Sequence, residues 1–335
     1  AMVGFAESSS LLGDDALAAE ALTAAQTLDR DLPEDLSEAA AAHLPGHRIH
    51  RTMNHGAPVQ SLRLTDHGGL VVRTAGAEAL VWHETGDIPQ VKIDLDGPAR
   101  QGRSIAVAGG MLVTCHENAP LAIFDLAAGK KIRNLRTHPG VATCVELSPG
   151  ADVVASGGSD RILRMWDVES GECKRTLEGH GAFITALAWH PTEALVVSAS
   201  ADGTARVWNL EHGRCIHVLE GHGGPIRGLA LAGDGLHNLA CAGQDGTVSI
   251  WDLETGRKLR TLRGHLSGVT SVVATSTFIA ASGEDGTIRL WHLESGETMR
   301  VLRLGNPIQD LAAAADELTL TAAHGSSVTV LPLPR

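Results

Sequence analysis

The chain has 335 residues, of which 43% are hydrophobic and 20% charged, as in a soluble globular protein. Its net charge is −12 and the sequence contains no basic stripe, which argues against a nucleic acid or an anionic membrane as the main partner. No apolar run reaches the ~18 residues of a membrane span, and the first basic residue is Arg30, so neither a membrane segment nor a secretory leader is expected.

Cysteine usage indicates the cellular compartment. The five cysteines are odd in number and form no Cys-x-x-Cys pair: Cys115, Cys144, Cys173, Cys215 and Cys241. We interpret all five as free thiols in a reducing compartment and expect a cytoplasmic protein.

The first 45 residues differ in charge from the rest of the chain. They carry nine acidic residues and one basic residue, for a net charge of −8. Within 14–28, four apolar residues would lie roughly on one helical face: Leu17, Leu22, Ala25 and Leu28. A second helix could begin at Pro33. We predict a separate acidic, alanine-rich segment over 1–45, either a docked helix pair or a flexible linker.

From residue 46 onward the chain repeats itself. Four tryptophans lie 42, 43 and 40 residues apart, each preceded six residues earlier by an aspartate and each in a unit that a histidine opens. They are Trp166, Trp208, Trp251 and Trp291. Repeats of this length with this signature are typical of a β-propeller built from four-stranded blades. Trp82, Phe124 and Leu331 continue the spacing at both ends, which makes seven blades over 46–335.

The fourth repeat shows the expected plan of a blade most clearly. An apolar strand over 184–189 is followed by a strand over 195–200 and a tight hairpin at 201–203. Strand 204–210 alternates in polarity, and a turn at 212–213 leads to an outer strand over 214–219.

The last repeat lacks a fourth strand, because the chain ends soon after 328–333. The segment 46–55 copies the spacing of 256–265, from a turn glycine to the repeat histidine. We therefore predict that a strand over 47–53 completes the last blade and closes the ring, which removes an exposed sheet edge.

These repeats resemble the WD40-repeat family over 46–335, most closely in blades 3 to 6 and in the style of bacterial members. The resemblance implies an all-β, seven-bladed propeller. It also implies a buried hydrogen-bonded set of His, Ser or Thr, Asp and Trp in each well-formed blade, here called the tetrad. Blade 4 provides His180, Ser198, Asp202 and Trp208, and blade 3 provides His138, Ser156, Asp160 and Trp166.

The tetrad contains a His–Asp–Ser trio, which could be mistaken for a catalytic triad. The trio recurs in adjacent blades, each time with a tryptophan, so we assign it a structural role. In blade 5, Cys241 occupies the hydroxyl position, and in blade 6 Ala281 does.

The resemblance also implies where a partner binds. In the family, partners contact the top face around the central channel, at the start of each inner strand and just before the turn aspartate. The corresponding residues here are Phe183, Thr185, Arg227, Gln244, Thr270, Glu284, Arg103, Gln309 and Gln60. Phe183 and Arg227 are the strongest candidates. The alternatives are that Phe183 folds back on its blade and that Arg227 pairs with an acid such as Glu284.

No catalytic or cofactor motif is present: the sequence has no phosphate-binding loop, His-Glu-x-x-His or Gly-x-Ser-x-Gly. We expect no metal, no cofactor and no catalytic residue. The leading hypothesis is a non-catalytic scaffold that binds a protein or peptide, as a monomeric propeller or within a larger complex. One alternative is a sensor or regulatory domain of a larger bacterial signalling protein whose kinase, protease or NTPase part lies elsewhere. Another is an enzyme with a site at the channel mouth.

Overall fold

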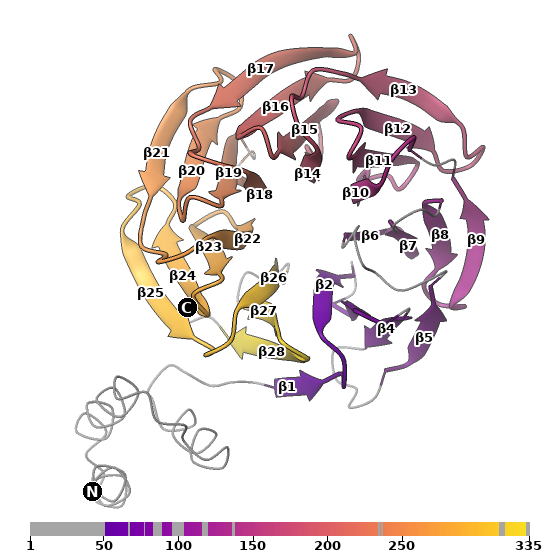
Figure 1. Cartoon of the computed structure of the whole chain (residues 1–335), viewed down its shortest axis with the longest axis horizontal. Coiled ribbons are helices and arrows are strands. Elements are labelled where there is room, and N and C mark those ends of the chain that lie inside the picture. Colours follow the sequence, from indigo (N-terminus) through magenta and orange to yellow (C-terminus); the bar gives the residue numbers. More distant parts are fainter. Residues whose placement is uncertain are drawn as a thin grey trace, which may run out of the picture.

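The structure is a computed structural model that describes residues 51–65, 68–76, 78–82, 89–95, 104–115, 120–135, 138–233, 235, 237–314 and 319–332. These residues form seven four-stranded antiparallel sheets arranged as blades around a central axis (Figure 1). The all-β, seven-bladed propeller expected from the repeats is confirmed. Within the described ranges there is no helix of the length and apolarity that crossing a membrane requires. The predicted segment 1–45 lies outside the described residues.

Blades 1 to 6 each run from the channel to the rim in chain order. Blade 1 contains β2 (Val59–Leu64), β3 (Leu70–Thr74), β4 (Glu78–Trp82) and β5 (Val91–Asp94). Blade 2 contains β6 (Ile105–Ala108), β7 (Met111–Thr114), β8 (Ala122–Asp125) and β9 (Lys130–Asn134). Blade 3 contains β10 (Ala142–Leu147), β11 (Val153–Gly158), β12 (Leu163–Asp167) and β13 (Cys173–Leu177). Blade 4 contains β14 (Ile184–Trp189), β15 (Leu195–Ser200), β16 (Thr204–Asn209) and β17 (Arg214–Glu220).

The remaining blades follow the same plan. Blade 5 contains β18 (Ile226–Ala232), β19 (Asn238–Gly243), β20 (Val248–Asp252) and β21 (Lys258–Leu262). Blade 6 contains β22 (Val269–Ala274), β23 (Phe278–Gly283), β24 (Thr287–His292) and β25 (Thr298–Arg303). Blade 7 contains β26 (Ile308–Ala313), β27 (Thr319–His324), β28 (Ser327–Pro332) and, as its outermost strand, β1 (Arg51–Asn54).

The strands of blade 4 match their predicted bounds to within one residue. The hairpin between β15 and β16 turns at Gly203, whose φ of 81° lies in the left-handed region that glycine tolerates best. This turn places Asp202 beside the first residue of β16, where its carboxylate accepts a hydrogen bond from the Thr204 amide at 2.9 Å.

The ring is closed by a strand from the other end of the chain, as predicted. β1 pairs antiparallel with β28, from Arg51 opposite Val330 to Asn54 opposite Ser327 (Figure 1). Met53 on β1 is buried and packs in one cluster with residues of blades 7 and 1. The predicted strand over 47–53 is therefore observed from residue 51, and its first four residues lie outside the described ranges.

The hydrophobic core is divided into layers between neighbouring blades. The buried cluster between blades 3 and 4, for example, contains Met165 and Leu163 of β12 together with Trp208 of β16. Each repeat tryptophan is almost fully buried in such a layer, with Trp208 at 2% exposure. A single blade cannot bury both its faces, so its stability depends on its neighbours.

Candidate functional site

The tetrad of blade 4 is assembled as expected and is buried. The Trp208 Nε1–H donates to Ser198 Oγ at 2.8 Å, and Ser198 Oγ lies 2.8 Å from His180 Nε2. The other ring nitrogen, His180 Nδ1, lies 3.0 Å from the Asp202 carboxylate. Blade 3 repeats the arrangement with His138, Ser156, Asp160 and Trp166, whose contacts span 2.7 to 3.1 Å.

The protonation states of His180 and Asp202 determine where the protons lie in the blade 4 tetrad. Burial lowers the pKa of His180 below its ordinary value of 6.5, so the ring is neutral at pH 7. Although burial alone would raise the pKa of Asp202, hydrogen bonds from Thr204 and the Gly181 amide hold it at about 2. An ionised carboxylate only accepts, so Nδ1 carries the proton and Nε2 accepts from the Ser198 hydroxyl. Every polar atom of the set is then satisfied, which is the arrangement of a structural network.

Blades 5 and 6 keep the histidine and the aspartate but lose the hydroxyl. His222 Nδ1 lies 3.4 Å from Asp245, and His265 Nδ1 lies 3.1 Å from Asp285. Within the described part of the chain, the Nε2 atoms of both histidines are buried without a hydrogen-bond partner. The Trp251 Nε1 of blade 5 is buried without a partner there as well. The tetrad is thus incomplete where Cys241 and Ala281 replace serine.

The innermost strands line a central cavity with a volume of about 1250 Å³. Of the nine predicted partner-binding residues, seven line this cavity: Gln60, Phe183, Thr185, Arg227, Thr270, Glu284 and Gln309. They come from five blades. Gln244 is exposed next to the turn aspartate of blade 5, and Arg103 lies outside the described residues.

Phe183 is an exposed aromatic side chain that lines this cavity. It directly precedes β14, and 47% of it is exposed to solvent. Sequence reasoning missed a second apolar residue of the connecting loops, Leu266, which is 90% exposed and directly follows the repeat histidine of blade 6. Its amide donates to Asp285 at 2.9 Å, so the backbone is held while the side chain is presented to solvent.

The polar residues of the site tie neighbouring blades together. The Thr185 hydroxyl donates to the Ile226 carbonyl at 2.5 Å, and the Thr270 hydroxyl donates to the Ile308 carbonyl at 2.6 Å. At the same position in blade 5, Arg227 reaches blade 6 instead and forms an ion pair of 2.6 Å with Glu284. This is the alternative that the sequence left open for Arg227. An ion pair as exposed as this one contributes little stability, so Arg227 retains the freedom to exchange its partner.

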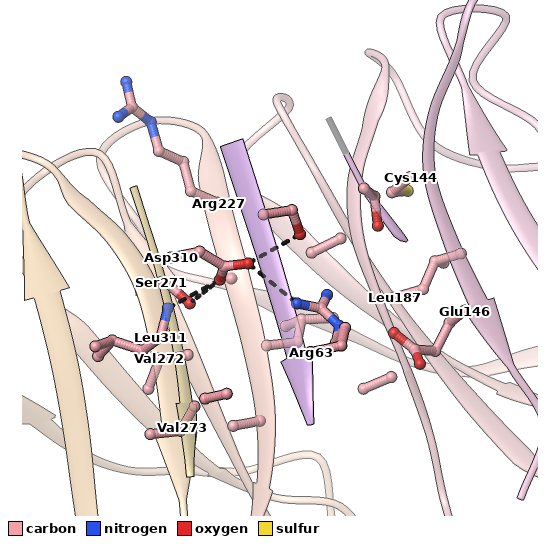
Figure 2. Close-up of a pocket in the computed structure, with 18 of the residues that line it drawn as sticks. Arg63, Cys144, Glu146, Leu187, Arg227, Ser271, Val272, Val273, Asp310 and Leu311 are labelled. Atoms are coloured by element: carbon pink, nitrogen blue, oxygen red, sulfur yellow. Dashed lines mark hydrogen bonds and ion pairs between the residues drawn. The ribbon is translucent and has the colours of Figure 1, made fainter. Parts of the chain in front are cut away.

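Deeper in the cavity, Asp310 of β26 joins three blades. It lies 3.1 Å from Arg63, and it accepts hydrogen bonds from the Ser61 hydroxyl at 3.0 Å and the Ser271 hydroxyl at 2.9 Å (Figure 2). The amides of Leu62 and Leu311 also donate to it. Figure 2 shows the Arg63 guanidinium directed at this carboxylate, with Arg227 extending away from the pair.

Glu146 on β10 also lines this wall (Figure 2). Burial raises its pKa to about 7, against the opposing effect of Arg63. Sequence reasoning missed Arg63, Glu146 and Asp310. Strand register provides the signal, because the positions equivalent to Arg63 and Glu146 in the other inner strands hold Ala106, Ala188, Ala230, Val273 and Ala312.

No group of three or more His, Cys, Asp or Glu side chains in the described ranges is placed to hold a metal ion. The residues that line the cavity provide apolar surface, hydrogen-bonding groups and charged side chains.

The seven blades define a β-propeller in which blades 3 and 4 carry complete tetrads. The family model described as WD domain, G-beta repeat (WD40) matches residues 129–167, 171–209, 213–252 and 256–292. The chain therefore contains WD40 repeats, four of which this model matches. Each match begins next to the outer strand of one blade and ends at the third strand of the next, so the sequence repeat is offset by one strand from the blade. Comparison with curated proteins gives no match.

Proposed function

We propose that this propeller is a non-catalytic scaffold that binds a protein or peptide at the top-face mouth of its central cavity. WD40 propellers generally act as protein-interaction scaffolds. The observation that carries the proposal for this chain is the convergence of seven residues from five blades on one cavity.

The composition of the site suits a peptide or loop. An exposed aromatic, Phe183, and an arginine, Arg227, line the same opening, and aromatic residues and arginine are enriched at protein interfaces. A cavity of about 1250 Å³ exceeds the ~300–1,000 Å³ of ordinary small-molecule pockets. It could therefore admit an inserted segment of a larger partner.

The tetrads support a scaffold in preference to an enzyme. Their serines are fully buried and already committed to a tryptophan and a histidine. All five cysteines are free, and three of them are buried, which supports the expectation of a reducing, cytoplasmic environment.

The test compares partner capture by two double variants of the whole chain. Phe183→Ala/Arg227→Ala removes the aromatic and the cation of the site. Ile132→Ala/Lys130→Ala removes an exposed apolar residue and an exposed cation from β9, on the rim of blade 2. Proteins retained from a lysate of the source cells are quantified by mass spectrometry, and a retained partner is then titrated against each variant.

We expect the wild-type protein and the β9 variant to retain equal amounts of a partner. Phe183→Ala/Arg227→Ala should retain at least ten-fold less of it. Equal retention by both folded variants would place the binding surface elsewhere and would refute the proposal.

A further inference from the structure

The fold gathers basic residues that are scattered along the sequence. The outermost strands of blades 2 to 6 carry ten lysines and arginines and a single acid, Glu220. The cations are Lys130, Lys131, Arg133, Lys174, Arg175, Arg214, Lys258, Arg260, Arg300 and Arg303. Because each repeat contributes only one to three of them, no basic stripe is visible in the linear sequence. The outermost strands are therefore basic although the chain carries a net charge of −12, and exposed acids such as Glu211, Glu254 and Glu294 lie in the turns beside them.

Part of this rim is also apolar. On β17, β21 and β25, the outermost strands of blades 4 to 6, large hydrophobic side chains are exposed to solvent. They are Ile216 at 37%, Val218 at 41%, Leu259 at 49% and Met299 at 56%. We call these three strands the rim belt. Its blades are consecutive, and blade 6 adjoins blade 7, where the chain enters the propeller through β1 (Figure 1).

The N-terminal 45 residues have the complementary chemistry. Their net charge is −8, and they contain leucines spaced among the acids, with Leu17, Leu22 and Leu28 on one predicted helical face. Even as continuous helix, 45 residues would extend about 68 Å, more than two diameters of a small domain. Length therefore does not prevent this segment from reaching the rim belt from β1.

We propose that residues 1–45 dock on the rim belt of their own propeller, with the leucines against Ile216, Leu259 and Met299 and the acids beside Arg214 and Arg303. Attraction between exposed charges acts over about a Debye length, ~8 Å at physiological salt and ~3 Å at 1 M. Docking should therefore weaken at high salt. Cations on an outer strand also prevent edge-to-edge pairing of sheets, and the experiment separates that role from docking.

The experiment measures distances between two spin labels on the full-length protein by pulsed electron paramagnetic resonance. The first label is at Ala19→Cys and the second at Thr298→Cys, an exposed position of β25, with Cys173→Ser and Cys215→Ser to remove the accessible native thiols. A reference pair uses Ala19→Cys with the native exposed Cys173 of blade 3. Dilution with unlabelled protein separates contacts within one chain from contacts between copies.

We expect a narrow distance distribution for the 19–298 pair at low salt. It should become at least two-fold broader in 1 M NaCl and in Arg214→Glu/Arg303→Glu. The matched reversal Lys130→Glu/Lys131→Glu on β9 should leave it unchanged, and the 19–173 distances should be longer. The proposal is overturned if the 19–298 distribution is equally broad at low salt, if it is unaffected by Arg214→Glu/Arg303→Glu, or if the short distance disappears on dilution.

Discussion

Replacing Ser198 by alanine tests the structural role of the tetrad. The substitution removes the hydrogen-bond partner of two buried groups, the acceptor His180 Nε2 and the donor Trp208 Nε1, each 2.8 Å from the hydroxyl. A buried polar group left unsatisfied costs about 1–3 kcal/mol. The deleted hydroxyl was itself buried, and its removal offsets part of this cost. We expect the free energy of unfolding to fall by about 2–4 kcal/mol.

Blade 5 provides a matched control. Ser249 is as fully buried as Ser198, yet its hydroxyl has no hydrogen-bond partner among the described residues. Ser249→Ala therefore deletes the same hydroxyl from an equally buried position, on the third strand of its blade, without breaking a network, and it should be neutral or stabilising. Urea unfolding of both variants, followed by tryptophan fluorescence and by circular dichroism, gives the comparison. If Ser198→Ala costs no more than Ser249→Ala, the tetrad does not stabilise the blade and our account of it is wrong.

Three further outcomes follow from the same contacts. Cys241→Ser should raise the free energy of unfolding by about 1 kcal/mol, because the new hydroxyl can bond His222 Nε2 and Trp251 Nε1; an unchanged urea midpoint would contradict this. Asp310→Ala should lower the free energy of unfolding by about 2–3 kcal/mol, which is less than the loss of a fully buried pair costs because the Arg63 side chain is 31% exposed. The same substitution should accelerate hydrogen exchange in β28 and β1 more than in β16. Burial lowers the pKa of the four repeat-opening histidines in the folded state, so the unfolded state binds more protons below pH 6.5. Stability should therefore fall on acidification from pH 6.5, by up to about 1.4 kcal/mol per pH unit for each histidine, and urea midpoints that are equal at pH 7.5 and 5.5 would refute this.

The repeat pattern predicted the fold because every blade uses the same arrangement of four strands. The tryptophan spacing, the turn glycine at Gly203 and the alternation of β16 each indicate the same strand bounds, and local and tertiary preferences agree. Closure of the ring by β1 was predictable for the same reason, since the last repeat lacked one strand.

The charged cavity wall was not predicted, because it depends on which residues meet across the channel. Arg63 and Asp310 are 247 residues apart in the chain and 3.1 Å apart in space. Repeat positions identify the inner strands, but only the strand register shows that Arg63 and Glu146 occupy positions where other blades hold alanine or valine. The ion pair of Arg227 with Glu284 was anticipated only as an alternative, because blade 5 departs there from the threonine of blades 4 and 6.

Asp310 also explains how blade 7 is held without a tetrad. This blade has Gly325 in place of the turn aspartate and Leu331 in place of the tryptophan, so its strands lack the internal network of blades 3 and 4. Asp310 connects its inner strand to Ser271 of blade 6 and to Ser61 and Arg63 of blade 1. Asp310 thus holds blade 7 to blades 1 and 6 from the channel side, within the cavity where we propose that a partner binds. A partner that contacts this wall should therefore stabilise ring closure, which predicts slower hydrogen exchange in β1 and β28 when it is bound.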